Sequence, residues 1–104
     1  MSPEIHNLFG LMMRARKIDV GSAKIIEGIK KKKYPLVVLA EDASDLTVEQ
    51  FEKQAAKTET EIIRCGTKDA LAYAIGKATT VAIGIVDRGF AKKMKQLLQD
   101  KNND

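Results

Sequence analysis

The chain has 104 residues, a formal net charge of +4, and 44% hydrophobic and 31% charged residues. This length fits a single domain, residues 1–104, and the apolar fraction is high enough for a core, which excludes a wholly disordered chain. The longest near-apolar stretch, Val81 to Val86, is far too short to cross a bilayer. With one cysteine, Cys65, and one histidine, His6, we expect neither an internal disulfide nor a zinc site, and a single thiol is typical of the reducing cytoplasm.

Charge is distributed unevenly along the chain. From Arg14 to Pro35 there are eight basic and two acidic residues, whereas from Glu41 to Glu61 there are seven acidic and two basic residues. This asymmetry predicts a basic front and an acidic back, and a basic face orients a protein toward a polyanion, most often a nucleic acid. Lysine runs are also common on ordinary solvated surfaces, so charge alone leaves both interpretations open.

Hydrophobic periodicity predicts helices alternating with strands in the first half of the chain. A helix is expected from Pro3 to Arg16, followed by a short strand from Ile18 to Val20. Ser22 is the expected N-cap of a second helix, which ends in the lysine run before Pro35. Leu36 to Ala40 is a continuous apolar run, typical of a strand that is buried on both faces.

The second half continues this alternation. Thr47 and Gln50 form a capping-box pattern, which predicts the start of a third helix at Thr47. Glu61 to Cys65 is the next expected strand, and Thr67 to Gly76 the next helix, with Thr67 and Gly76 as its caps. Val81 to Val86 predicts a further buried strand.

Asp87 is the expected cap of a fifth helix, and Lys101 to Asp104 is expected to be a polar tail. Helices between strands predict an α/β fold, a three-layer α-β-α sandwich with a small mixed, mostly parallel sheet of about four strands. Ligands of such sheets bind beyond the carboxyl ends of strands or at helix N-termini. Three loops qualify, namely Gly21-Ser22, Glu41 to Asp45, and Lys77 to Thr80.

The sequence contains no recognisable catalytic constellation. Glu41 and Asp42 are adjacent carboxylates, but neighbouring residues of an extended chain point in opposite directions, and no third acid, histidine or lysine completes a set. Cys65 ends a predicted buried strand, where a thiol packs as a small apolar group. No complete phosphate-binding or dinucleotide-binding motif is present. We therefore expect a protein that is not an enzyme and holds neither a metal nor a cofactor.

The segment around Gly21 is the strongest candidate site. A glycine before a helix lets the backbone approach a ligand closely, and the N–H groups at the helix start bind phosphate or base acceptors. We expect nearby basic side chains to extend this site, and these are Arg14, Arg16, Lys17, Lys24 and Lys31. An ordinary helix start with charged flanks has the same sequence pattern.

Several short segments resemble the bacterial YlxQ-like branch of the ribosomal L7Ae/L30e family of kink-turn RNA-binding proteins. They occur in the family's order and spacing from about Asn7 to Lys93, and comprise Leu8 to Ile18, Gly21, Leu36 to Ser44, Gly66 to Leu71, Ala74 to Lys77 and Asp87 to Ala91. The resemblance implies an α-β-α sandwich that binds RNA without catalysis. The implied partners are structured RNA, ribosomal RNA among them, and ribosome-associated proteins. We expect a cytoplasmic monomer that makes no membrane contact.

In the family, a Gly-x-Asn-Glu-x-x-Lys motif at the start of the second helix recognises the sheared G·A pairs of a kink-turn. By position this motif falls on Gly21 and Ser22, with Ala23, Lys24 and Glu27 in the places of Asn, Glu and Lys. Ala23 has no hydrogen-bonding side chain, Lys24 can only donate, and Glu27 is an anion where the family has a cation. The resemblance therefore implies an RNA site here with backbone and phosphate contacts in place of the family's base contacts.

A second loop of the family, after the fourth helix, packs on a flipped-out nucleotide. By position it falls on Lys77, Ala78, Thr79 and Thr80. A different class of function remains open, since the same fold without RNA binding could be a protein-interaction module. Glu27 and the acidic stretch from Glu41 to Glu61 would then be its working surface.

Overall fold

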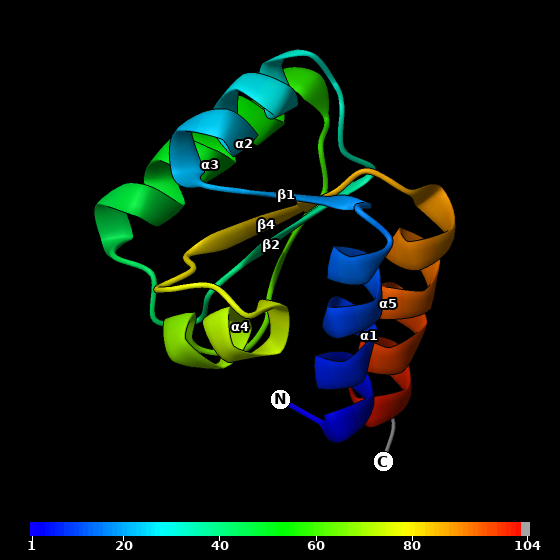
Figure 1. Ribbon diagram of the computed structural model, residues 1–104. Helices are drawn as coiled ribbons and strands as arrows, with labels where there is room; N and C mark the ends of the chain where they lie inside the picture. Colours follow the sequence, from blue (N-terminus) through cyan, green and yellow to red (C-terminus); the bar gives the residue numbers. More distant parts are fainter. Residues whose placement is uncertain (103–104) are drawn as a thin grey trace.

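Five helices alternate with four strands in the computed structural model, which describes residues 1–102 (Figure 1). In chain order the elements are α1 (Pro3–Arg14), β1 (Ile18–Val20), α2 (Ser22–Lys30), β2 (Leu36–Leu39), α3 (Asp45–Thr58), β3 (Ile62–Arg64), α4 (Lys68–Ile75), β4 (Ala82–Ile85) and α5 (Arg88–Asn102). Every expected element is present. Helix α5 runs to Asn102, into the expected polar tail, and the end of that tail at Asp104 lies outside the described residues.

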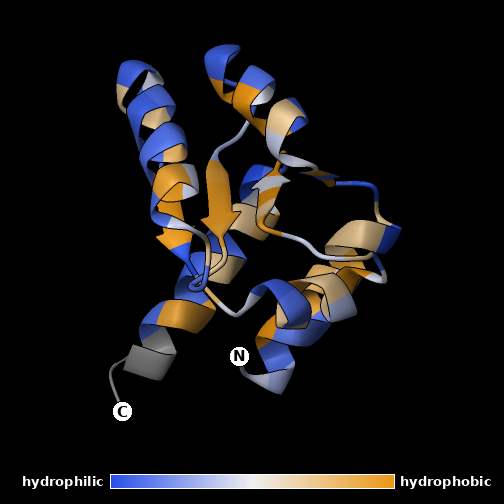
Figure 2. Cartoon of the chain, turned by 90° about the vertical axis from the view of Figure 1, so that its left-hand side faces the viewer, coloured by the Kyte–Doolittle hydropathy of each residue, from blue (hydrophilic) through white to orange (hydrophobic). Residues whose placement is uncertain are grey.

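The strands form one mixed sheet between two layers of helices. Their order is β1-β4-β2-β3. Helices α2 and α3 cover one face of the sheet, and α1, α4 and α5 cover the other (Figure 1). Figure 2 shows apolar residues along the strands and on the helix sides that face them. The expected three-layer α-β-α sandwich with four strands is therefore confirmed.

The sheet is not mostly parallel, which corrects the prediction. Strand β2 pairs in parallel with β3, but β4 pairs antiparallel with both β1 and β2. The physical reason lies in α4, whose eight residues span only about 12 Å. This short helix stays at the end of the sheet where β3 finishes (Figure 1), so the chain re-enters the sheet from the same end. Strands β1 and β2 do run in the same direction, but β4 lies between them.

Strand β2 separates two apolar cores. Leu36 and Val38 contribute to the core with α1, α4 and α5, whereas Val37 and Leu39 contribute to the core with α2 and α3. All four side chains are fully buried. This confirms the expected strand covered on both faces and fixes the sheet as the centre of the molecule.

Tyr34, just before β2, locks α2 against the sheet. Its ring occupies the space that side chains at Gly28 and Gly84 would fill, and a Cβ on Gly84 would come within 2.7 Å of it. Its hydroxyl donates a hydrogen bond to Asp19 on β1. One buried aromatic residue therefore joins α2, β4 and the edge strand β1.

Two helix starts differ from the prediction. Gly21, not Ser22, is the N-cap of α2, and its φ of 98° lies in the region that glycine adopts readily. Ser44, not Thr47, caps α3, because its hydroxyl accepts from the Thr47 N–H at 3.2 Å. Thr47 therefore lies in the first turn of α3. The expected caps at Thr67 and Gly76 are confirmed.

Candidate nucleic-acid interface

Three connections meet at one end of the sheet, and we call residues 21–24, 40–44 and 76–81 together the loop edge. Val20 at the end of β1 lies opposite Ile83 of β4, and Leu39 at the end of β2 lies opposite Ala82. The Ala40 N–H donates to the Val81 carbonyl at 2.8 Å. The three loops that the sequence identified far apart in the chain are therefore neighbours in space.

The start of α2 is exposed at the loop edge and has no side-chain cap. Gly21 is exposed, and nothing lies within 4 Å of the position that a Cβ would take there. The first turns of the other described helices each receive a cap from an oxygen of Ser2, Ser44, Thr67 or Asp87. Without such a cap, the first N–H groups of α2 keep their capacity to bind an acceptor on another molecule.

The α4–β4 loop lies beside this helix start. Lys77, Ala78 and Thr79 are exposed, whereas Thr80 is buried. The Thr80 hydroxyl donates to the Ala78 carbonyl at 3.1 Å, which holds the loop in one shape. The loop therefore adds a cation, Lys77, and a hydroxyl, Thr79, to the surface around Gly21.

The remaining predicted site residues lie away from Gly21. Arg16 and Lys17 precede β1, so they sit at its other end, about 13 Å from Gly21 along the strand. Lys31 is the C-cap of α2, about 14 Å along the helix from Ser22. Neighbours in sequence are thus separated here by the length of a strand and the length of a helix.

Asp19 on β1 binds one lysine from the start of α2 and one from the segment that follows α2. Its carboxylate is 2.7 Å from Lys33 Nζ and 3.5 Å from Lys24 Nζ. Burial raises the pKa of the Asp19 carboxyl, but the hydrogen bonds from Lys33 and Tyr34 and the two lysine charges outweigh it, so the pKa lies below its ordinary value. The pKa of the Tyr34 hydroxyl, in contrast, is raised by burial and by its hydrogen bond to Asp19. Asp19 thereby holds Lys24 beside the start of α2.

Glu27 pairs with Lys30, three residues later on the same helix. Its carboxylate is 3.3 Å from Lys30 Nζ, whereas Lys24 pairs with Asp19. The side chains of Glu27 and Lys30 are 63% and 50% exposed, so the pair adds at most a few tenths of a kcal/mol. Glu27 is therefore an accessible anion in the middle of α2.

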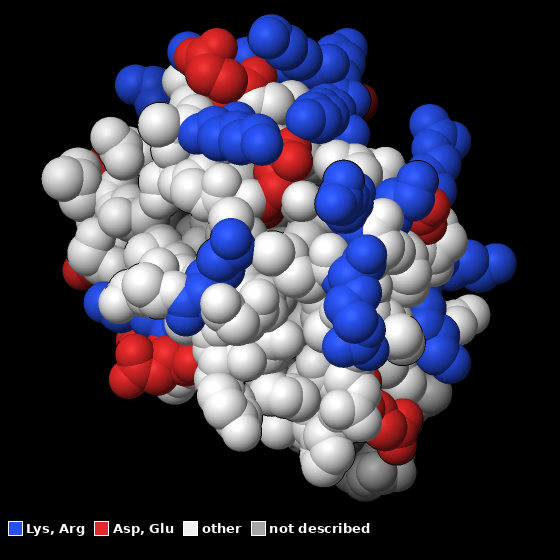
Figure 3. Space-filling view, in the orientation of Figure 1, with Lys and Arg blue, Asp and Glu red and all other residues white. Residues whose placement is uncertain are grey.

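The helices of the basic and acidic stretches are neighbours. Helix α2 of the basic stretch packs beside α3 of the acidic stretch on the same side of the sheet. In Figure 3 the Lys and Arg side chains gather over α2 at the top and continue down over α1 and α5. The two helices share one core, which includes Ile25, Ile29, Phe51 and Ala55, and the basic front and acidic back stay a prediction.

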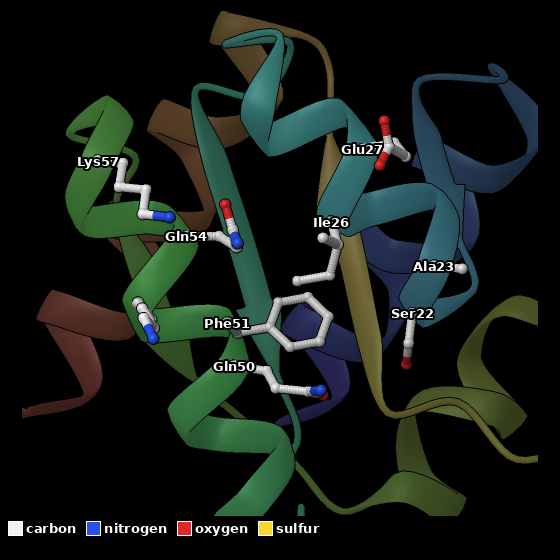
Figure 4. A pocket seen from close by; sticks show the side chains of 9 residues that line it. Ser22, Ala23, Ile26, Glu27, Gln50, Phe51, Gln54 and Lys57 are labelled. Carbon is white, nitrogen blue, oxygen red and sulfur yellow. The ribbon is translucent and has the colours of Figure 1, made fainter.

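A groove with a volume of about 560 Å³ runs between α2 and α3. Ile26 and Phe51 lie side by side within it (Figure 4). Ser22 and Gln50 lie at the end nearer the loop edge, and Glu27 lies farther along α2. The groove combines an apolar centre with amide, hydroxyl and carboxylate groups. Sequence reasoning did not find it, because its two walls are 20 or more residues apart.

The sequence interpretation passed over Tyr73 and its contact with His6. Tyr73 on α4 is 81% exposed, and its ring centroid lies 5.3 Å from that of His6 on α1. The available signal was the position of Tyr73, an aromatic residue next to the buried stripe of Leu71, Ala72 and Ile75 but outside it.

Residues 4–95 match the family described as ribosomal protein L7Ae/L30e/S12e/Gadd45. The chain belongs to this family. The RNA-binding protein YlxQ of Enterococcus faecium is 37% identical over 93 residues, which cover 89% of each chain. The protein of the same name from Bacillus subtilis (strain 168) is 33% identical over 91 residues, 88% of this chain and 91% of that one. The resemblance seen in the sequence is thus confirmed.

Solved structures agree with this family membership. A protein of unknown function from Bacillus halodurans superposes with a TM-score of 0.88 at 28% identity, over 94% of this chain and 99% of that chain. The Giardia lamblia 15.5kD RNA binding protein superposes with a TM-score of 0.75 at 17% identity, over 96% and 89% of the two chains. At that identity the second likeness concerns the fold alone. Within the described part of this chain, no helix is long and apolar enough to span a membrane.

Proposed function

We propose that this chain is a small, non-enzymatic protein that binds structured RNA at the loop edge. The observation that carries the proposal is the antiparallel pairing of β1 with β4, with Val20 opposite Ile83. This pairing places the uncapped start of α2 beside the α4–β4 loop. The family resemblance implies RNA contacts from these same two segments, and the relatives described above are named RNA-binding proteins.

The chemistry of the loop edge favours phosphate over base edges as the main ligand. The exposed helix start supplies N–H donors, and Lys24 and Lys77 supply positive charge. Phosphate contacts of this kind position a protein on RNA without selecting a sequence. Ala23 offers no side-chain group to a sheared G·A pair. The proposed ligand is therefore an RNA whose backbone shape fits the loop edge, such as a bend in ribosomal RNA.

The proposal is tested by fluorescence anisotropy with a labelled kink-turn RNA and a plain duplex of equal length at two salt concentrations. Each phosphate contact should contribute about −0.7 to −0.9 to the slope of log K against log salt. We expect Lys24→Glu to weaken binding at least several-fold more than Lys92→Glu, which makes the same charge change on the exposed side of α5. Affinity that is insensitive to salt, or equal losses for the two variants, would contradict the proposal.

The groove between α2 and α3 supports the alternative, a protein-interaction module. Its apolar centre and polar rim are typical of a surface that receives another protein. The anisotropy experiment separates the two functions. If neither RNA binds at low salt, the loop edge loses its proposed role and the groove becomes the leading site.

A further inference from the structure

Tyr73 is an exposed aromatic ring supported by a second ring. It is 81% exposed, whereas Tyr34, Phe9 and Phe51 are buried. Its ring is tilted by 42° against His6, with 5.3 Å between the centroids. The contact fixes Tyr73 on the surface between α1 and α4. A large aromatic ring held in solvent in this way is typical of a binding surface.

Two cations lie near the end of α4, the helix that carries this ring. Lys77 follows Tyr73 by four residues and is the first residue of the α4–β4 loop after the cap at Gly76. The side chain of Arg14 lies near the end of α4. A Cβ on Gly10 of α1 would be 3.5 Å from Arg14 Nη1 and 3.6 Å from the carbonyl oxygen of Ala74. The ring and the two positive charges thus come from three different segments of the chain.

The two ends of α4 differ in charge. At the start of α4 the charges of Lys68 and Asp69 offset each other, whereas Lys77 follows the end of the helix with no acidic residue next to it in the chain. In Figure 3 the surface over α4 and the lower part of α1 is largely uncharged, with Lys and Arg side chains above and beside it and acidic groups at its lower left. A polyanion is therefore attracted to the end of α4 that Lys77 follows.

We propose that Tyr73 stacks on an unpaired base of an RNA strand that leaves the loop edge, with Arg14 and Lys77 binding the neighbouring phosphates. This inference rests on the proposed function, because the strand must be delivered from the loop edge. Stacking suits the site, since every base has a flat face and an aromatic side chain with flanking cations binds single strands with little sequence preference. In this arrangement Arg14 and Lys77 bind phosphates near the end of α4, and Tyr73 binds the base.

The chain offers a clean spectroscopic test, because it contains no tryptophan and its second tyrosine is buried. In Tyr73→Trp, the tryptophan fluorescence reports on this position alone. We would titrate this variant with a kink-turn RNA that carries a short single-stranded extension and with the same RNA without the extension. Stacking predicts strong quenching by the extended RNA and little quenching by the blunt RNA.

Binding measurements complete the test. Tyr73→Ala should lower affinity for the extended RNA about tenfold and leave affinity for the blunt RNA unchanged, whereas Tyr73→Phe should retain wild-type affinity. Leu11→Ala, which truncates an exposed apolar side chain on α1, is the control and should bind as wild type. If RNA binds but Tyr73→Ala matches wild type and Tyr73→Trp is not quenched, this inference fails and the proposed function stands. If neither RNA binds the wild-type chain, both fail.

Discussion

The hydroxyl of Tyr34 donates a 2.8 Å hydrogen bond to Oδ2 of Asp19, which lies fifteen residues earlier on the edge strand β1. Only 13% of the Asp19 side chain is exposed, so this carboxylate depends on protein partners in place of water. The same ring fills the gap between α2 and β4. A single residue therefore links packing of the second core to the charge arrangement beside the loop edge.

Removal of the Tyr34 hydroxyl should destabilise the fold. In Tyr34→Phe the ring still fills its space, but Asp19 loses a partner and the free energy of unfolding should fall by about 1–2 kcal/mol. Tyr73→Phe removes a hydroxyl from an exposed ring and should leave it unchanged. Urea denaturation followed by circular dichroism measures both, and equal stability of the two variants would mean that the Asp19 contact is not stabilising.

Two glycines should respond in opposite ways to the same substitution. Gly84→Ala places a Cβ within 2.7 Å of the Tyr34 ring, and such overpacking typically costs about 1–3 kcal/mol. Gly10→Ala in α1 meets its nearest atoms at 3.5 and 3.6 Å, which is ordinary contact, and should stabilise the helix by about 0.5–1 kcal/mol. Thermal unfolding of both variants should shift the midpoint down for the first and up for the second. A higher midpoint for Gly84→Ala would contradict the packing described for Tyr34.

Acid should weaken the fold partly through Asp19. Because the pKa of this carboxyl is lower in the folded chain than the ordinary value of an aspartate, the folded state holds the proton less readily than the unfolded chain. The stabilisation is therefore complete above about pH 4 and is lost as the pH falls through the folded pKa. Asp19→Asn should flatten the pH dependence of the unfolding free energy between pH 5 and pH 2 relative to the wild type. Parallel curves for the two proteins would place the acid sensitivity elsewhere.

Glu27→Lys should strengthen RNA binding about tenfold, equivalent to roughly 1.4 kcal/mol. The substitution removes an accessible anion one turn beyond Lys24, releases Lys30 from its pair, and places a cation where the family motif has one. Glu52→Lys on α3 makes the same change in net charge away from the loop edge and serves as the control. The measurement is a titration of each variant against a kink-turn RNA. An equal gain for the two variants would assign the effect to net charge, and no gain would place this side of α2 away from RNA.

Local patterns predicted most of this fold. The apolar run from Leu36, the cap at Thr67 and the left-handed end at Gly76 each depend on a few adjacent residues, and each is present in the structure. The start of α2 was misplaced by one residue because a glycine with positive φ serves as its cap without any side-chain signal. The direction of β4 was also missed, since it depends on α4 remaining at one end of the sheet, and no motif encodes that placement.

The candidate site was predicted only in part, because local patterns show its segments but not how the fold brings them together. The Gly21 turn and the loop after α4 carry sequence signals, and β-pairing brings them together. Arg16 and Lys17 are close to Gly21 in sequence, but a strand holds its two ends apart, so proximity along the chain was misleading there. The pairing of Lys33 with Asp19 and the contact of Tyr73 with His6 join distant segments, and only tertiary structure shows them.

The strand order also determines how the sheet meets other chains. Its two outer strands, β1 and β3, are three residues long, and each contains a charged residue, Asp19 or Arg64. A foreign strand that tried to extend the sheet would find few unpaired backbone groups and, at β1, a carboxylate already bound by two lysines. Short, charged borders of this kind oppose fibril growth. The molecule can therefore expose an aromatic ring on α4 while the edges of its sheet resist pairing with strands of other chains.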